Sequence, residues 1–243
     1  MRSIVLLALA AVSGVLSAQS LTILNGASFR TGQPVTAGSW ASAYGAFGNV
    51  TQTVASASPI PQTLAGVTVT VNGAAAPVYF VSAGQVNFLV PAAVTAGVRT
   101  VEVKTAAATL TGTVRVMSAA PGIFANNGDG AILNQDSSAN SNTNRARRGQ
   151  VVQIYATGPG ALTRPVADGA AAPSSPLALT VSTPEVFIAG VPATVQFSGM
   201  APGFAGLWQV NVTVPDNAFI SGRVPLQLFM DGVDSNEVNL FVQ

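Results

Sequence analysis

Residues 85–91 read QVNFLVP and residues 209–215 read QVNVTVP, so the chain carries one strand-like heptad twice. The two copies begin 124 residues apart, at positions 85 and 209. Internal repetition decides the number of modules before any other feature is weighed. The doubled heptad therefore predicts two copies of one β module in this chain of 243 residues.

Two further echoes extend the repeat. The tripeptide ILN occurs at residues 23–25 and again at 132–134, and NGAAAPV at residues 72–78 is echoed by AGVPATV at 189–195. The spacing between copies grows along the chain, from 109 residues through 117 to 124. Growing spacing indicates loop insertions in the second copy, which β modules tolerate because loops lie on the surface.

Alternation of apolar and polar residues marks the strands. In residues 67–71, which read VTVTV, valine alternates with threonine, the period-two pattern of a half-buried strand. In the heptad the same period turns Val86 and Phe88 inward and Asn87 outward, and Pro91 ends the strand because proline cannot donate to the ladder. Short strands separated by glycine and proline are typical of a β-sandwich.

The predicted fold is therefore all-β, with two tandem immunoglobulin-like β-sandwich modules after a cleaved signal peptide. Arg2, an apolar run and a small residue before Gln19 predict a signal peptide at residues 1–18, with a buried N-terminal helix as the alternative. Module one is expected at 19–124 and module two at 125–243. The ILN echo at 132–134 predicts the opening strand of module two inside a segment whose composition would otherwise suggest a linker.

Composition excludes several classes of function. The chain has no cysteine and no histidine, which removes disulfides, thiolate metal sites and the commonest general base. Charged residues make up only 8% of the chain, and no cluster resembles a nucleic-acid footprint. Arg145, Arg147 and Arg148 form the one basic cluster, which reads either as a solvated loop or as a protease or polyanion site.

Seven short pieces of sequence carry a resemblance to a known family. They follow one another through the chain at residues 25–29 (NGASF), 82–88 (SAGQVNF), 120–124 (APGIF), 154–158 (IYATG), 201–204 (APGF), 208–211 (WQVN) and 235–238 (SNEV). In this ordered set the chain resembles the Solibacter-type uncharacterised C-terminal domain of acidobacterial exported proteins. Pro159 departs from the pattern, which has an apolar residue such as leucine there. The resemblance implies an exported protein and brings no activity, cofactor or catalytic residue.

The acidic residues suggest no catalytic pair. None of the nine acids lies in a motif that would place two carboxylates across a sugar-binding cleft, so we expect no catalytic residues and no cofactor. Calcium is the alternative for Asp129 with Asp136 and for Asp231 with Asp234, although neither pair has the spacing of a calcium loop. Asp231-Gly232 reads more simply as a hairpin turn, and we expect no metal site.

Binding residues are sought among aromatic and amide side chains. Exposed aromatic rings stack on sugars, and the candidates are Trp40, Tyr44, Tyr79, Tyr155 and Trp208. Trp208 ranks first because it follows an inserted loop that reads MAPGFAG, where module one has only a glycine. The paired amides of the two heptads are further candidates, with a neutral outer face or an intermodule contact as the alternative: Gln85, Asn87, Gln209 and Asn211.

These observations predict a non-enzymatic, exported structural or protein-interaction module of the bacterial cell envelope. Its expected partners are other envelope or extracellular proteins, with polysaccharide as an alternative and a carbohydrate-binding accessory module as the second hypothesis. A nearly neutral surface with a single lysine favours association. We expect no nucleic-acid partner, no membrane span in the mature chain, and a location in the periplasm or at the cell surface.

Overall fold

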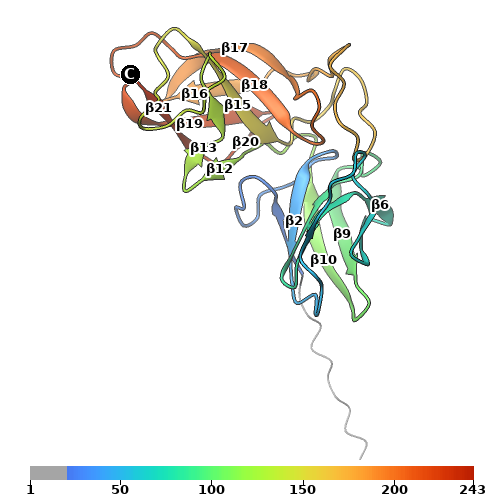
Figure 1. The fold of residues 1–243 in the computed structure, drawn as a ribbon. Helices are drawn as coiled ribbons and strands as arrows, with labels where there is room; N and C mark the ends of the chain where they lie inside the picture. The colour runs from blue at the N-terminus through green and yellow to red at the C-terminus, as the bar shows by residue number, and fades with distance from the viewer. Residues whose placement is uncertain (1–20) are drawn as a thin grey trace, which may run out of the picture.

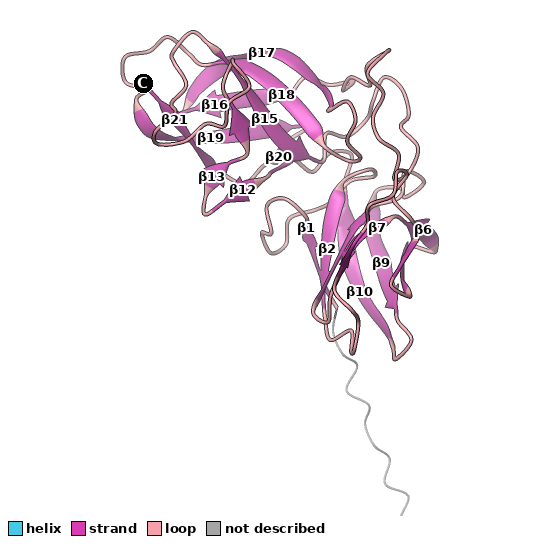
Figure 2. Ribbon diagram, in the orientation of Figure 1, coloured by secondary structure: helices cyan, strands magenta, loops and turns pink. Residues whose placement is uncertain are grey.

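The period-two pattern of the sequence is realised as strands throughout the computed structural model, which describes residues 21–243. In β5 (Val67–Val71) the three valines are buried and the two threonines are half-buried. Figure 2 shows strands and loops, and no helix occurs in the part of the chain that the structure describes. None of these residues forms a helix that could cross a bilayer. The predicted signal peptide lies outside the described residues.

Module one is a sandwich of two antiparallel sheets. The first sheet has the order β1-β2-β8-β7-β3 and the second β10-β9-β5-β4, with β6 paired to β5. Valines and Phe88 from both inner faces form its core. The remaining strands span β1 (Thr22–Asn25), β2 (Trp40–Tyr44), β3 (Thr53–Val54), β4 (Thr63–Leu64), β6 (Ala74–Ala76), β7 (Val78–Val81), β8 (Gln85–Leu89), β9 (Gly97–Lys104) and β10 (Thr109–Val116).

Module two repeats this plan above module one in Figure 1. One long strand, β17 (Val191–Met200), pairs with β16 at one end and with β18 at the other, so it links the two sheets into a single path. The other strands span β11 (Gly122–Ile123), β12 (Ala125–Asn126), β13 (Asp129–Gly130), β14 (Ile132–Leu133), β15 (Val151–Thr157), β16 (Glu185–Ile188), β18 (Trp208–Thr213), β19 (Gly222–Met230), β20 (Val233–Asp234) and β21 (Val238–Val242).

The boundary between the modules lies earlier than the sequence suggested. Val116 is the last residue in the first core, and Ala119 is the first in the second. β11 pairs with β15 of module two, so residues 119–124 belong to that module and not to module one. β14 pairs with β15 as β1 pairs with β2, but β11 to β13 precede it, so it is not the opening strand.

The two heptads occupy equivalent strands in equivalent register. Gln85 faces Tyr44 across β8 and β2, and Gln209 faces Tyr155 across β18 and β15. Each glutamine amide donates to the asparagine two residues on, at 2.8 Å in module one and 2.9 Å in module two. The duplication inferred from sequence is therefore present in the fold.

Two irregularities are also shared by the copies. The β5–β6 turn at Asn72 and the β16–β17 turn at Ala189 both have positive φ angles at the two central residues, the geometry of a type I′ hairpin. In β7 a bulge inserts Tyr79 between the pairs made by its neighbours, and in β17 a bulge inserts Gln196. Tyr79 and Gln196 are thus equivalent positions.

The chain passes from module one into module two between Val116 and Ala119, and we call this point the chain crossing. Hydrogen bonds near it join the two modules, and we call this set of contacts the seam. Asn25, at the end of β1, is fully buried, and its amide nitrogen donates to the carbonyl oxygen of Ala120 at 3.0 Å. The hydroxyl of Thr36 donates to the carbonyl of Ser118 at 3.1 Å. Gly158 packs so closely on this crossing that a side chain there would collide with the carbonyl oxygen of Ala120. The next residue, Pro159, is buried in the same turn.

Two loops of module two extend this seam. We call residues 158–184, between β15 and β16, the strap, and residues 201–207, between β17 and β18, the wedge loop. The strap accepts the backbone N–H of Ala92 on the carboxylate of Asp168 at 2.9 Å. The wedge loop accepts the indole N–H of Trp40 on the carbonyl of Ala205 at 3.2 Å. The wedge loop is the insertion that lengthened the spacing between the copies to 124 residues.

Removal of the Asn25 side chain should destabilise the protein by about 2–4 kcal/mol, because it strands several buried backbone groups at once. The side-chain oxygen accepts the N–H groups of Ala27 and Ser28, and the amide nitrogen serves Ala120. Urea unfolding of Asn25→Ala measures the loss. Asn49→Ala is the matched control, since Asn49 is exposed. Equal midpoints for the two variants would contradict the assigned role.

Candidate functional site

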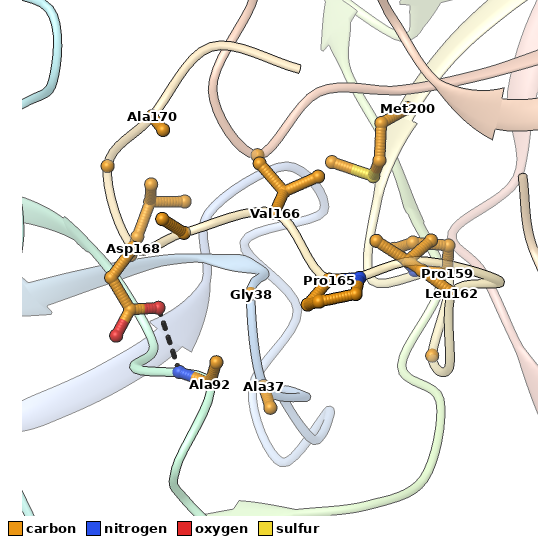
Figure 3. A pocket seen from close by; sticks show the side chains of 15 residues that line it. Ala37, Gly38, Ala92, Pro159, Leu162, Pro165, Val166, Asp168, Ala170 and Met200 are labelled. Carbon is orange, nitrogen blue, oxygen red and sulfur yellow. Dashed lines mark hydrogen bonds between the residues drawn. The ribbon is translucent and has the colours of Figure 1, made fainter. Parts of the chain in front are cut away.

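The seam leaves two hollows where residues of both modules meet. The first, which we call the strap pocket, has a volume of about 330 Å³ and lies under the strap. Figure 3 shows Met200 and Val166 beside it, with Asp168 hydrogen-bonded to the backbone of Ala92. Its lining is mainly proline, glycine and alanine, and Asp168 is its one charged residue. A single carboxylate that already accepts a backbone N–H offers little chemistry.

The second hollow, which we call the aromatic cleft, has a volume of about 300 Å³. Module one contributes Trp40 from β2 and Tyr79 from β7, whose rings meet edge to face with centroids 5.3 Å apart. Module two contributes Phe124 and, from the wedge loop, Phe204. Tyr79 is 39% exposed and Phe204 is 59% exposed, so both rings present area to solvent.

The cleft also contains a small polar group. Asn87 of β8 and Ser42 of β2 face each other across the sheet and both line the cleft. The hydroxyl of Ser42 donates to the side-chain oxygen of Asn87 at 3.0 Å, and the amide of Gln85 donates to the same oxygen at 2.8 Å. The amide nitrogen of Asn87 has no hydrogen-bond acceptor within residues 21–243, and since every fully buried side-chain nitrogen there is satisfied, this nitrogen is not fully buried.

Trp208, the aromatic residue that ranked first in the sequence, does not lie in the cleft. Its ring is 0% exposed and belongs to the core of module two. Its indole N–H donates to the hydroxyl of Ser198 at 3.0 Å. A ring without exposed area cannot stack on a sugar, so the structure corrects the expectation of an exposed Trp208.

The four amide candidates are divided between two faces. Asn87 lines the aromatic cleft, and Gln85 holds it in place. Gln209 and Asn211 form the same pair in module two, half-buried on its outer face, with Gln153 in place of Ser42. No hollow that we identify among the described residues is lined by either of them.

The aromatic walls differ between the copies. By register, the position of Trp40 in module one is held by Val151 in module two, and that of Tyr79 is held by Gln196. The cleft is thus a property of module one completed by the wedge loop. Sequence reasoning had Trp40 and Tyr79 among its candidates but missed Phe204 and Phe124. Aligning the copies at the heptads would have shown that Trp40 has no aromatic counterpart.

The acidic residues do not gather. Among residues 21–243 no three acids lie together in a way that could hold a metal ion. Asp129 pairs with Arg223 at 2.8 Å, and Asp234 pairs with Arg30 at 3.3 Å. Asp231-Gly232 forms the β19–β20 hairpin turn, as predicted.

Shifts of pKa also have local structural causes. Hydrogen bonds from the hydroxyl and the backbone of Ser138 lower the pKa of the Asp136 carboxyl, in a surface turn. Partial burial raises the pKa of Tyr44 and of Tyr155, which occupy equivalent positions in the two copies. None of these groups lines either hollow of the seam.

The three arginines of the basic cluster lie in the loop between β14 and β15. Arg145 donates to the side chain of Asn142 at 2.6 Å, and Arg148 donates to the carbonyl of Ile220 at 3.2 Å. These contacts tie Arg145 and Arg148 to nearby loop residues of the same module. They fit the solvated-loop interpretation of the cluster.

Replacement of Trp208 by alanine should lower the stability of module two. We expect this variant to act through the fold and not through the loss of a ligand contact. Because the ring is buried, Trp208→Ala is expected to lower the free energy of unfolding by about 3–5 kcal/mol. Tyr79→Ala, at an exposed ring, should change it by about 1 kcal/mol or less. Denaturant unfolding followed by circular dichroism compares the two. A Trp208→Ala protein as stable as the native chain would show that the ring is not part of the core.

No protein-family model matches the chain, and no characterised protein matches its sequence. Solved structures resemble it in architecture. The Bacteroides ovatus mixed-linkage glucan utilization locus protein SGBP-B, in complex with a mixed-linkage heptasaccharide, shares 14% identity over 88% of this chain and 45% of its own, with a TM-score of 0.36. The plexin A4 extracellular region shares 12% identity over 94% of this chain and 19% of its own, with a TM-score of 0.31.

The tandem immunoglobulin repeats of Dlar share 14% identity over 93% of this chain and 99% of their own, with a TM-score of 0.25. The chain spans less than half the length of SGBP-B and of plexin A4. At these TM-scores the likenesses decide nothing about what this chain binds. The chain is an all-β protein of two tandem immunoglobulin-like sandwiches.

Proposed function

We propose that this protein is an exported, non-enzymatic binding module of the bacterial cell envelope. The observation that carries the proposal is the aromatic cleft, in which Tyr79 and Phe204, from different modules, expose their rings on either side of the seam. Soluble proteins bury most large aromatic rings, and exposed ones that line a hollow mark binding sites.

The chemistry of the chain supports binding over catalysis. It has no histidine or cysteine, so a serine nucleophile would lack its usual base. Asp129 and Asp234 are each occupied by an arginine. The aromatic cleft is lined by no Asp, Glu, Lys or Arg that could transfer a proton.

The tandem arrangement supports a role that depends on fixed geometry. Hydrogen bonds from the chain crossing, the strap and the wedge loop join the modules at separate points. Such a unit presents its cleft without the entropic cost of ordering a linker on binding. Low charge on the surface suits association with other envelope components.

The partner classes follow from the same surface. The partners that fit it are other components of the envelope or the extracellular space, either proteins or polysaccharide. The resemblance to the Solibacter-type C-terminal domain family and the predicted signal peptide support export and belong to this proposal. Together they suggest a periplasmic or surface location.

Affinity capture tests the proposal. The predicted mature chain, residues 19–243, is immobilised and exposed to a bacterial envelope extract. Each retained component is then isolated, and its binding to the purified protein is measured directly. We expect saturable binding that is weakened by the double variant Tyr79→Ala/Phe204→Ala and is unaffected by Gln196→Ala in module two. Chemical conversion of the retained component, seen by mass spectrometry, would establish an enzyme and reject the proposal.

A further inference from the structure

We propose that the aromatic cleft binds a short stretch of a neutral polysaccharide, with a sugar ring packed against Tyr79 and Phe204 and a hydroxyl group accepting a hydrogen bond from Asn87. The inference rests on the proposed binding function and names the ligand class of the same site. It follows from the charge, the rings, the amide and the place of the cleft on the sheet.

The lining is electrically neutral. Its residues include no Asp, Glu, Lys or Arg, and no salt bridge of the described chain adjoins it. A charged ligand would lose its hydration on entering and would find no opposite charge to replace it. The cleft therefore favours a ligand without formal charge, which excludes nucleic acid and acidic glycans.

The rings suit the apolar faces of a sugar. The C–H groups on one face of a pyranose carry slight positive charge and pack against the negative face of an aromatic ring. Tyr79 and Phe204 expose 39% and 59% of their surface, so their rings are available to a ligand. Trp40 is instead fixed in the wall of the cleft by its hydrogen bond to Ala205. Two rings contributed by different modules can contact a ligand from two directions.

The side-chain amide of Asn87 supplies a directional hydrogen-bond donor in the cleft. Ser42 and Gln85 both donate to the side-chain oxygen of Asn87, so the side-chain nitrogen of this amide is used by neither of them. The side-chain nitrogen is then the accessible donor. A sugar hydroxyl oxygen can accept from it, and a fixed donor loses little entropy on binding.

The position of the cleft argues against an extended peptide. Trp40 and Ser42 come from β2, Asn87 from β8 and Tyr79 from β7, three strands that are neighbours within one sheet. The cleft therefore lies over the face of the sheet, where backbone groups are already paired between strands. A peptide that binds by adding a strand needs a free edge, which this face does not offer.

The size of the cleft limits the ligand. A volume of about 300 Å³ lies at the small end of ligand sites, so only a short part of a polymer would occupy it. The chain of the polymer would continue into solvent. Binding should therefore be weak for a monosaccharide and stronger for an oligosaccharide.

Module two supplies a matched control. It retains the glutamine-to-asparagine hydrogen bond at Gln209 and Asn211, but it has Val151 and Gln196 where module one has Trp40 and Tyr79. A variant of Asn211 therefore removes the same amide from the same register without touching the cleft. Any general effect of the substitution on the fold should appear there as well.

Isothermal titration calorimetry with neutral oligosaccharides of glucose, mannose, galactose and xylose tests the inference, beside an acidic oligosaccharide and a proline-rich peptide. At least one neutral oligosaccharide is expected to bind. Tyr79→Ala, Phe204→Ala and Asn87→Ala should each weaken it about tenfold, whereas Asn211→Ala and Gln196→Ala should change the Kd by less than about twofold. Ligand binding should also change the tryptophan fluorescence of the protein. The change can be assigned to Trp40, because Trp208, the other tryptophan, is buried in the core of module two.

Equal losses in Asn87→Ala and Asn211→Ala, or cleft-dependent binding of the acidic oligosaccharide or the peptide alone, would overturn the inference. So would the absence of binding by any neutral oligosaccharide. If the envelope extract still yields a partner whose binding needs Tyr79 and Phe204, the proposed function stands while the ligand class is wrong. If neither experiment shows binding at the cleft, both proposals fail.

Discussion

The contact between Trp40 and the wedge loop is the interaction on which the aromatic cleft depends. The indole N–H donates to the carbonyl of Ala205, and the backbone of Gly206 packs against Leu89 and the same indole. A side chain at position 206 would overlap Leu89, so only glycine permits this approach. A hydrogen bond from the backbone N–H of Ala172 holds Phe204 to the strap, and the Trp40 contact places the wedge loop against module one, beside Tyr79.

Much of the fold could be predicted from the sequence, because duplication and alternation are both visible in it. The register of Gln85 and Gln209 and the burial of Val86 and Phe88 follow directly from the repeated heptad. Leu89 does not follow: alternation turns it outward, yet it is only 4% exposed, because the wedge loop covers it. Contacts between modules are absent from a pattern that describes one strand at a time.

The candidate site was predicted less well, for a physical reason. Trp208 was expected to be an exposed binding residue because it follows an inserted loop. The insertion instead lengthens the hairpin, so that Trp208 pairs with Met200 and continues the inward face of Val210 and Val212. Period-two alternation, applied two residues further back, would have placed the ring inside. Phe204 could not have been placed this way, since a residue in an irregular loop has no periodic face.

The bulge shared by β7 and β17 has a meaning for how the two copies came to differ. Because it occurs at the same place in both modules, the simplest history has it present before the duplication. A bulged residue is the extra one in its strand and has no partner opposite it on the strand where the bulge occurs, so its side chain is not tied to a cross-strand neighbour there. Tyrosine in one copy and glutamine in the other are two uses of that freedom. The bulge offers evolution a position where new chemistry can be tried on the face of a sheet while the pairing of the strands stays the same.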